Sequence, residues 1–408
     1  MTTRADAEAL DAADPLAALR DRFTLPDGVI YLDGNSLGAL PRSTPDRLAA
    51  AVEHEWGQRL VRSWNEAGWW TASRRIAGLL APLLGCSADE VVVADSTSVN
   101  LFKLLIAGLR MRPGRPVVVA ERGAFPTDVY IARSAAELSG GELRLIDGPE
   151  DLPAVLDERT GVVLLSHVDF RTGAMWPAAE TTAAVQRAGA LMVWDLCHST
   201  GALDVRLRDW NADMAVGCGY KYLNGGPGAP SYAFVAAEHH SDLHTPLPGW
   251  HGHADPFAMS PDYVPAQGIG QLAGGTPPVL SLLALEAAVE VLTSVSTTEL
   301  RAKGVALTSF FIDLITERCP ALEVVSPRAA DRRGSQVALR FTSAFELVQA
   351  LIERGVIGDF RAPDIARFGF VPAYSRFVDV WDAVGHIADV VDTGQYRADR
   401  FANRSTVT

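Results

Sequence analysis

Short apolar runs alternate with longer amphipathic stretches over the first three quarters of the chain. A strand that is apolar at every position indicates a sheet covered on both faces. Four runs of this kind predict buried parallel strands: residues 91–94, 116–120, 162–166 and 191–195. Spacing typical of helices falls between or after them, at residues 98–109, 128–138 and 180–188. This alternation predicts a mostly parallel, doubly wound α/β sheet, in which ligands bind beyond the carboxyl ends of the strands.

The pattern changes after about residue 297. Helical spacing at residues 299–317, 346–354 and 378–391, with a strand-like run at 336–341, predicts a smaller α+β domain. A helical pattern at residues 279–291 would connect the two parts. We therefore expect residues 1–50 to join the small domain, 51–297 to form the large domain and 298–408 the small one, with a frayed tail over 396–408.

Composition narrows the classes of partner. The net charge of −13 disfavours nucleic acid and anionic membranes, which attract clustered positive charge. No run approaches the roughly 20 apolar residues of a membrane span, and the first residues are acidic and alanine-rich, so we expect a cytoplasmic protein with small-molecule ligands. Four cysteines without CxxC spacing predict reduced core thiols, namely Cys86, Cys197, Cys218 and Cys319.

No metal site is expected. The histidine pairs at residues 239–240 and 251–253 have no further ligands nearby in the sequence, whereas a closed site needs three or four.

Lysine is rare, with Lys103, Lys221 and Lys303 against 33 arginines. A desolvated lysine can lose its proton and attack a carbonyl, which a guanidinium cannot do. Lys221 lies in a glycine-bracketed aromatic segment after the predicted strand 191–195, so it is the candidate for reversible attachment to an aldehyde cofactor. Lys103 and Lys303 fall inside helical patterns, where we expect them to be solvated.

Asp195 closes an apolar strand, and a buried carboxylate there needs a partner. A protonated pyridine nitrogen would suit it. His198, three residues on, would lie on the same side of a helical turn and support that contact. Asp195 together with Lys221 points to pyridoxal chemistry, in which one group tunes the ring and the other holds the aldehyde.

Two other strand ends carry candidate ligand groups. The turn at residues 95–100 places Thr97 and Ser98 at a helix start, where hydroxyls and free amides can bind a phosphate, although the same residue types are ordinary helix caps. Phe125 could stack on a flat ring or lie in the core, and Asp128 follows it. In the small domain, Arg361 and Arg367 flank Asp364. Either arginine could clamp a carboxylate, but the residues alone favour surface pairing.

These segments together resemble kynureninases, which are pyridoxal-phosphate (PLP) enzymes of the aspartate-aminotransferase fold (fold type I). The resemblance covers nearly the whole chain. Its most specific parts are Tyr-Leu-Asp-Gly-Asn-Ser-Leu-Gly at 31–38 and Tyr-Lys-Tyr-Leu-Asn at 220–224, and further matches lie at 62–65, 125–128, 249–253, 275–278, 359–361 and 367–370.

The resemblance implies a role for each matching residue. Lys221, Tyr220 and Asp195 would be catalytic, and Arg367 would hold the substrate carboxylate. The implied cofactor contacts are Thr97, Ser98, Phe125, Asp128, Thr172, Asp195, His198, Tyr220 and Lys221, with Trp250 and Thr276 reaching across a homodimer interface. The implied substrate contacts are Asn35, Ser36, Trp64, His253, Thr276 and Arg367.

The implied reaction is hydrolysis of the Cβ–Cγ bond of L-kynurenine to anthranilate and L-alanine, in tryptophan catabolism through the kynurenine pathway that also serves NAD biosynthesis. Trp64 and Thr276 resemble bacterial members that prefer kynurenine, so 3-hydroxykynurenine is expected as the lesser substrate.

Two alternatives stay open on the sequence. A cysteine desulfurase or selenocysteine lyase shares the fold but usually carries His before the lysine and a reactive cysteine on a loop, whereas Tyr220 precedes Lys221 and Cys319 precedes a proline. A non-catalytic regulatory protein would be expected to lose Lys221, Asp195 or the phosphate turn, all of which are present.

Overall fold

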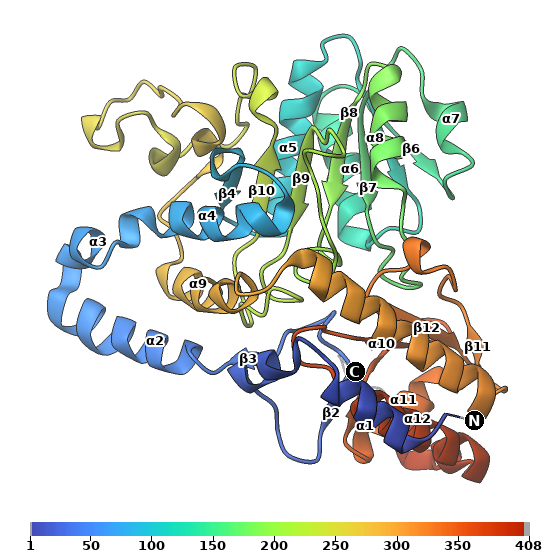
Figure 1. The fold of residues 1–408 in the computed structure, drawn as a ribbon. Coiled ribbons are helices and arrows are strands. Elements are labelled where there is room, and N and C mark those ends of the chain that lie inside the picture. The colour runs from blue at the N-terminus through green and yellow to red at the C-terminus, as the bar shows by residue number, and fades with distance from the viewer. Residues whose placement is uncertain (1, 404–408) are drawn as a thin grey trace.

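Two main sheets of different size organise the chain, whose computed structural model describes residues 2–403 (Figure 1). The larger sheet has seven strands in the order β4-β10-β9-β8-β7-β5-β6. Their bounds are β4 Val91–Val93, β5 Val117–Glu121, β6 Glu142–Ile146, β7 Thr160–Ser166, β8 Leu191–Asp195, β9 Met214–Gly217 and β10 Tyr232–Val235. The predicted strands at 116–120, 162–166 and 191–195 are confirmed as parallel.

The predicted parallel pairing of residues 91–94 is wrong, because β4 pairs antiparallel with β10. Strand β10 is also antiparallel to β9. Since β10 runs against both of its neighbours, β4 still points the same way as β9. The carboxyl end of β4 therefore lies at the same edge of the sheet as those of the parallel strands, where the chemistry was expected.

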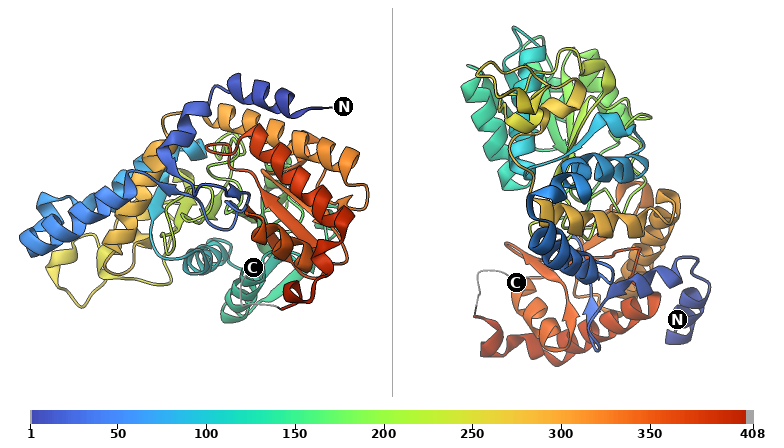
Figure 2. Two further views of the ribbon diagram at one scale, coloured as in Figure 1. Left: turned by 90° about the horizontal axis from the view of Figure 1, so that it is seen from below. Right: turned by 90° about the vertical axis from the view of Figure 1, so that its left-hand side faces the viewer.

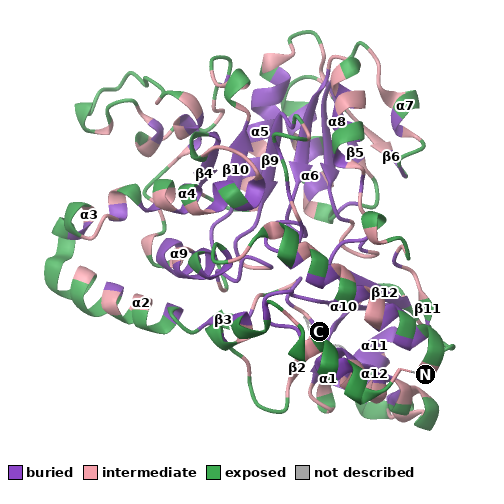
Figure 3. Cartoon of the chain, in the orientation of Figure 1, coloured by how far each residue is buried: buried purple, intermediate pink, exposed green. Residues whose placement is uncertain are grey.

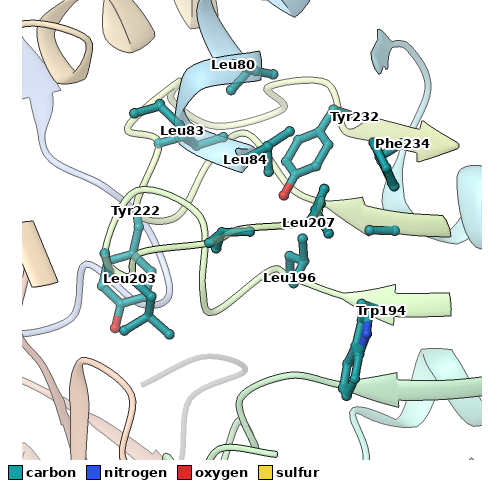
Figure 4. Close-up of a cluster of buried hydrophobic side chains, with 14 of the residues drawn as sticks. Leu80, Leu83, Leu84, Trp194, Leu196, Leu203, Leu207, Tyr222, Tyr232 and Phe234 are labelled. Carbon is teal, nitrogen blue, oxygen red and sulfur yellow. The ribbon is translucent and has the colours of Figure 1, made fainter. Parts of the chain in front are cut away.

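Helices cover both faces of the large sheet, as predicted from its apolar strands. The helices α5 (Thr97–Met111) and α6 (Pro126–Leu138) share one core with alternate strand residues such as Val118 and Leu164. On the other face, α4 (Ala72–Leu84), α8 (Ala178–Arg187) and α9 (Val279–Leu292) pack on the intervening positions. Figure 4 shows part of that second core, with Leu80, Leu83 and Leu84 of α4 beside Tyr232 and Phe234.

The smaller sheet is antiparallel, in the order β11-β12-β15-β14. Its strands are β11 Glu323–Val324, β12 Gln336–Arg340, β14 Asp359–Arg361 and β15 Ile365–Gly369. The helices α10 (Thr297–Arg318), α11 (Ala344–Glu353) and α12 (Phe377–Thr393) surround a separate core that also includes Ala7 and Leu32. Because this core is separate, we propose that the small domain begins near residue 297, as predicted, and that the N-terminal residues belong to it.

The N-terminal segment connects the two parts of the molecule. Helix α1 (Arg4–Ala12) lies along α12, and β2 (Ile30–Tyr31) pairs with β13 (Val356–Ile357). Strands β1 (Phe23–Thr24) and β3 (Leu40–Pro41) form a small antiparallel pair.

In the large domain, a short helix α7 (Leu152–Val155) follows β6.

An arm extends from the body between these segments and α4 (Figures 1 and 2). It consists of α2 (Thr44–Ala50), a π-helical stretch (Ala51–Arg59), a short 3-10 helix (Leu60–Arg62) and α3 (Ser63–Glu66). Figure 3 shows that most of the arm is exposed. Its exposed side chains include large apolar ones, namely Val52, Trp56, Leu60 and Val61.

Two predictions about the chain's exterior are wrong. The tail turns back over residues 396–403 and buries Tyr396 and Phe401 against the small-domain core, while residues 404–408 lie outside the described part. Lys103 and Lys303 are buried rather than solvated, and each contacts an aspartate, Asp95 and Asp14 respectively. Helical spacing alone could not reveal that an acid from another segment meets each lysine.

Within residues 2–403, no single helix has both the length and the apolarity needed to cross a membrane. Helices α9 and α10 pass such a test only as a pair, and the chain bends by 81° between them.

The buried ion pair between Lys303 and Asp14 generates a stability prediction. Their side chains are 6% and 4% exposed, and the ammonium lies 2.6 Å from the carboxylate. Lys303→Ala leaves a buried carboxylate without its cation, so we expect the free energy of unfolding to fall by about 3–5 kcal/mol. Urea unfolding followed by circular dichroism measures it. Arg206→Ala, which breaks an exposed pair with Asp204, is the control and should change little.

Candidate active site

Lys221 lies in the loop that follows β9, at the carboxyl edge of the large sheet. Its Nζ is 2.9 Å from His198 Nε2. The ring centroids of Tyr220 and Phe125 lie 5.8 Å and 6.0 Å from the same nitrogen. The structure therefore brings together four residues that the sequence nominated, from three different strand ends.

Gly38 explains why the segment 31–38 accompanies the lysine segment. Its amide donates a hydrogen bond of 2.8 Å to the carbonyl of Tyr220. A Cβ at position 38 would lie 2.4 Å from the Lys221 carbonyl and as close to the Asn224 side chain. Only glycine allows the N-terminal segment to approach the lysine turn this closely.

Two buried carboxyl groups face each other beside this lysine. Asp195 ends β8, and its Oδ1 accepts a 2.7 Å hydrogen bond from the Cys197 amide. Asp128, in the first turn of α6, is 2% exposed. Burial, followed by the charge of Asp195, raises the pKa of Asp128 well above its usual range. Such a pair is stable with a proton or a cationic group between or beside its members.

The helical turn predicted at His198 is not formed. Residues 197–199 form a turn rather than a helix, which directs the imidazole toward Lys221 on one side and toward Gln336 on the other. The Nδ1 atom lies 2.9 Å from Gln336 Oε1. Sequence reasoning missed Gln336 because it comes from the small domain, 138 residues away.

The turn between β4 and α5 has the geometry expected of an anion-binding helix start. Ser96 is the cap, since its Oγ accepts from the Val99 amide at 3.4 Å. The cap function therefore does not fall on Thr97 or Ser98, which occupy the first turn of α5, where amides have no partner within the helix. Thr97 Oγ1 lies 3.8 Å from Cys197 Sγ, so this turn adjoins the loop after Asp195.

Lys103 holds the turn between β4 and α5 in place. Its buried ammonium donates to the carboxylate of Asp95 and, at 2.6 Å, to the Leu272 carbonyl. The backbone of Asp95 has a positive φ of 52°. The contact ties the β4–α5 turn to the segment that leads to Thr276.

Arg367 is 1% exposed, so the surface pairing favoured by the residues alone is wrong. It forms a two-pronged ion pair with Asp359, with Nε 2.8 Å from Oδ1. Nη1 donates to the Phe170 carbonyl and Nη2 donates to Ser36 Oγ at 3.0 Å. The amide of Asn35 accepts from Nε at 3.0 Å when its oxygen faces the guanidinium. Asn35, Ser36 and Arg367 thus form one group.

Thr172 is not placed at this site. Its hydroxyl and amide both bond the carboxylate of Asp169. Ser166, at the end of β7, lies at the site instead and donates to Asp128 Oδ2 at 3.4 Å. The rule that ligands bind at strand ends could have found Ser166, because it is the last residue of a predicted strand.

Four further predicted residues lie near the arm, and three of them, Trp64, Trp250 and Thr276, lie in or beside an aromatic group there. Trp64 contacts Trp70 edge-on at 6.3 Å, and Trp70 contacts Trp250 at 5.4 Å. Trp250 Nε1 donates to Thr276 Oγ1 at 3.3 Å. His253 has local partners for both ring nitrogens, the Asp255 amide and the Asp262 carbonyl.

A cavity of about 550 Å³ opens between Tyr220 and the turn that joins β4 to α5, which we call the phosphate-type turn. Its lining includes Leu37, Asp95, Ser96 and Pro278. A larger cavity of about 820 Å³ lies elsewhere, between residues 20–42 and α12. Its arginines already contact aspartates or backbone carbonyls, for example Arg20 with Asp379 and Arg354 with Asp389. The smaller cavity adjoins the candidate site, because Tyr220, which precedes Lys221, and Ser96, which caps α5, both line it. We place the chemistry beside this cavity.

Comparison with solved structures defines the fold. The cysteine desulfurase from Thermococcus onnurineus NA1 matches with a TM-score of 0.78 at 17% identity, covering 92% of this chain and 98% of that one. A C-DES variant with glycine covalently linked to its PLP cofactor matches with a TM-score of 0.80 at 17% identity, covering 91% and 99%. The fold is that of the PLP-dependent enzymes of fold type I.

Sequence relatives then identify the family. Kynureninase from Burkholderia mallei strain SAVP1 is 50% identical over the full length of both chains, and kynureninase from Pseudomonas fluorescens is 47% identical over the same extent. Residues 300–387 match the kynureninase C-terminal domain family. The chain belongs to the kynureninase family.

A pH prediction follows from Asp33, which lies beside the Arg367 group. Burial, followed by the nearby charge of Asp359, raises the pKa of Asp33 to about 7, against smaller opposing effects of Ser36 and the two arginines Arg367 and Arg361. An acid whose pKa is raised by folding makes the folded state less stable as pH rises from its unfolded value to its folded one. That window runs from about pH 4 to pH 7.

Asp33→Asn should remove this pH dependence. Relative to the parent protein, the variant should gain stability between pH 5 and pH 8, by at most about 4 kcal/mol. Urea unfolding at both pH values measures the difference, and any fixed cost of the substitution cancels in the comparison. The exposed Asp27→Asn is the control. An equal effect of Asp33→Asn at both pH values would contradict the prediction.

Proposed function

We propose that this protein hydrolyses the Cβ–Cγ bond of L-kynurenine to give anthranilate and L-alanine, with PLP as cofactor. Full-length identity of 50% to a kynureninase carries the proposal. The convergence of Lys221, His198 and Asp195 on one sheet edge supports it. The preference for L-kynurenine over 3-hydroxykynurenine rests on Trp64 and Thr276 and is part of the same proposal.

The side chains present fit PLP. Lys221 would hold the aldehyde carbon covalently. Phe125 is 46% exposed, so its aromatic face is available to stack on the ring. Thr97 and Ser98 would bind the phosphate at the start of α5. When bound, PLP supplies a pyridinium ring that withdraws electrons from the substrate α-carbon.

The buried carboxyl pair accounts for the ring nitrogen. Asp195 would accept the N–H of a protonated pyridine, which supplies the positive charge that two adjacent buried carboxyl groups require. Asp128, with its raised pKa, can remain protonated and donate a hydrogen bond. Ser166 would hold Asp128 in place.

Proton transfers fall to Lys221 and Tyr220. Once displaced by the substrate amine, the Lys221 side chain can remove the α-proton as a general base. Burial raises the pKa of Tyr220 above its ordinary value, so this phenol stays protonated and can donate near the γ-carbon. Water then adds to the γ-carbonyl, and the bond to the β-carbon breaks.

Arg367 would bind the substrate carboxylate. Among the described residues, one N–H of Nη1 has no acceptor, while its other N–H groups bond Asp359, Ser36 and Phe170. The guanidinium is therefore held in place and retains a donor for an incoming carboxylate. Binding in this buried setting is strong because few waters compete.

A homodimer and a cytoplasmic location belong to the same proposal. The arm and the aromatic group around Trp70 expose apolar side chains such as Leu60 and Phe257, which a second copy would cover. Through that contact Trp250 and Thr276 would reach the partner's phosphate turn. The four cysteines are free, which suits a reducing compartment.

A desulfurase function needs a reactive thiol on an exposed loop. Within residues 2–403, Cys197, Cys218 and Cys319 are buried and Cys86 is partly buried. Cys319 is 2% exposed, and burial raises its pKa to about 11. Burial also raises the pKa of Cys86 to about 12. Thiols of this kind stay protonated and are poor nucleophiles.

The first test removes the proposed anchor. Lys221→Ala should abolish turnover of L-kynurenine and the visible absorbance of covalently held PLP, because no other lysine lies in the loop after β9. Anthranilate fluorescence and an absorption spectrum measure the two effects. Sulfide release from cysteine, assayed in the parent protein, separates the desulfurase alternative. Retained absorbance in the variant would remove Lys221 from this role.

The second test concerns the carboxylate clamp. Arg367→Ala should weaken substrate binding by about 2–5 kcal/mol, seen as a higher KM, because the substrate carboxylate would lose a buried cation. Arg361→Ala, which removes a neighbouring cation that also pairs with Asp359, is the matched control. Thermal unfolding of both variants separates a loss of binding from a loss of folding. An unchanged KM for Arg367→Ala would exclude it as the clamp.

A further inference from the structure

Gln336 occupies a fully buried position in β12, and its hydrogen bonds determine how its amide is oriented. Nε2 donates to the carbonyls of Asp169 at 3.1 Å and Phe170 at 2.9 Å. Two backbone carbonyls can only accept, so the nitrogen must face them. The oxygen Oε1 is therefore directed at His198 Nδ1, 2.9 Å away.

This orientation determines the protonation of His198. A carboxamide oxygen only accepts hydrogen bonds, so Nδ1 must carry the proton. In a neutral imidazole the lone pair then lies on Nε2, which is the atom 2.9 Å from Lys221 Nζ.

The surroundings of His198 favour the neutral ring. The charged groups that act on it are the cations Lys221, Arg367 and Arg361, and Tyr222 packs edge-on against it at 6.5 Å. Burial, followed by these cations, lowers the pKa of His198 well below its ordinary value. An imidazolium at this position would be repelled by these cations.

We propose that Gln336 is a positioning residue for the reaction: it holds His198 as the neutral Nδ1–H tautomer, so that Nε2 accepts a hydrogen bond from the Lys221 amine. The inference rests on the proposed function of Lys221 as the base. A neutral amine has two N–H bonds and one lone pair. Committing one N–H to His198 Nε2 restricts the directions in which the lone pair can point, and so orients the base.

The same residue connects the base to the small domain. In the small sheet, Gln336 pairs with Gly369, two positions beyond Arg367 on β15. The Phe170 carbonyl that accepts from Gln336 also accepts from Arg367. One sheet of the small domain thus holds both the proposed carboxylate clamp and the group that sets the acceptor for Lys221. Substrate binding and base orientation are coupled through it.

Two substitutions test the tautomer directly. Gln336→Glu keeps an acceptor oxygen for Nδ1–H, loses the Nε2 donor to the carbonyls of Asp169 and Phe170, and adds a negative charge. The charge favours the imidazolium, whose Nε2 cannot accept. Gln336→Met has a similar size and removes the acceptor. Gln349→Glu is the control, because it adds the same charge to the small domain at a side chain whose Nε2 has no hydrogen-bond partner.

Imidazole ¹⁵N NMR of the PLP-loaded proteins reports the tautomer, with the His198 signals assigned by their loss in His198→Asn. We expect Nδ1–H in the parent protein, an imidazolium in Gln336→Glu at pH 7, and a shift toward Nε2–H in Gln336→Met. For Gln336→Glu, kcat with L-kynurenine should fall by about tenfold to a hundredfold at pH 7, and the acidic limb of its pH profile should move to higher pH. PLP content should be unchanged.

Two results would overturn the proposal. One is a parent protein whose His198 carries its proton on Nε2. The other is a folded Gln336→Glu variant whose kcat and pH profile match those of Gln349→Glu. The NMR result is independent of turnover, so failure of the parent protein to release anthranilate would contradict the proposed function without deciding the tautomer.

Discussion

The hydrogen bond from the Gly38 amide to the Tyr220 carbonyl joins the two halves of this molecule beside Lys221. Residues 30–33 on one side of it are built into the small domain, through the pairing of β2 with β13 and the bridge from Asp33 to Gly369. On its other side lies the loop that carries Lys221 at the edge of the large sheet. Because a Cβ at position 38 would overlap that loop, the site exists only when both cores are correctly placed.

Buried charge is the second constraint on the site. Lys103, Asp195, Asp128, Arg367 and Asp359 are all less than a tenth exposed, and each has a charged or hydrogen-bonding neighbour. Isolated charges in such places would cost several kcal/mol, so these groups must be assembled together. This explains why Lys103, which has no role in the proposed chemistry, is as buried as the residues that have one. It holds the phosphate-type turn to the segment before Thr276.

The accuracy of the sequence-based predictions depended on how local the cause was. Strand β8 ends at Asp195 as predicted, and α5 and α6 begin near the predicted residues, because runs of apolar residues and helix starts are local properties. The antiparallel β10 and its pairing with β4 were missed because pairing is a contact between distant segments. The same reason applies to Thr172, which was nominated through resemblance but is turned toward Asp169, while Ser166 occupies the place beside Asp128.

The sequence by itself determined the α/β class, the strand ends at which the candidate groups lie and the lysine proposed to hold an aldehyde cofactor. These follow from side-chain periodicity and from the different chemistry of lysine and arginine. Only the tertiary structure decided that Arg367 is buried against Asp359, that Lys103 and Lys303 are paired, and that His198 lies between Lys221 and Gln336. Each of these depends on a partner from a distant segment. A buried polar group needs such a partner, and the partner comes within reach only when the two cores come together.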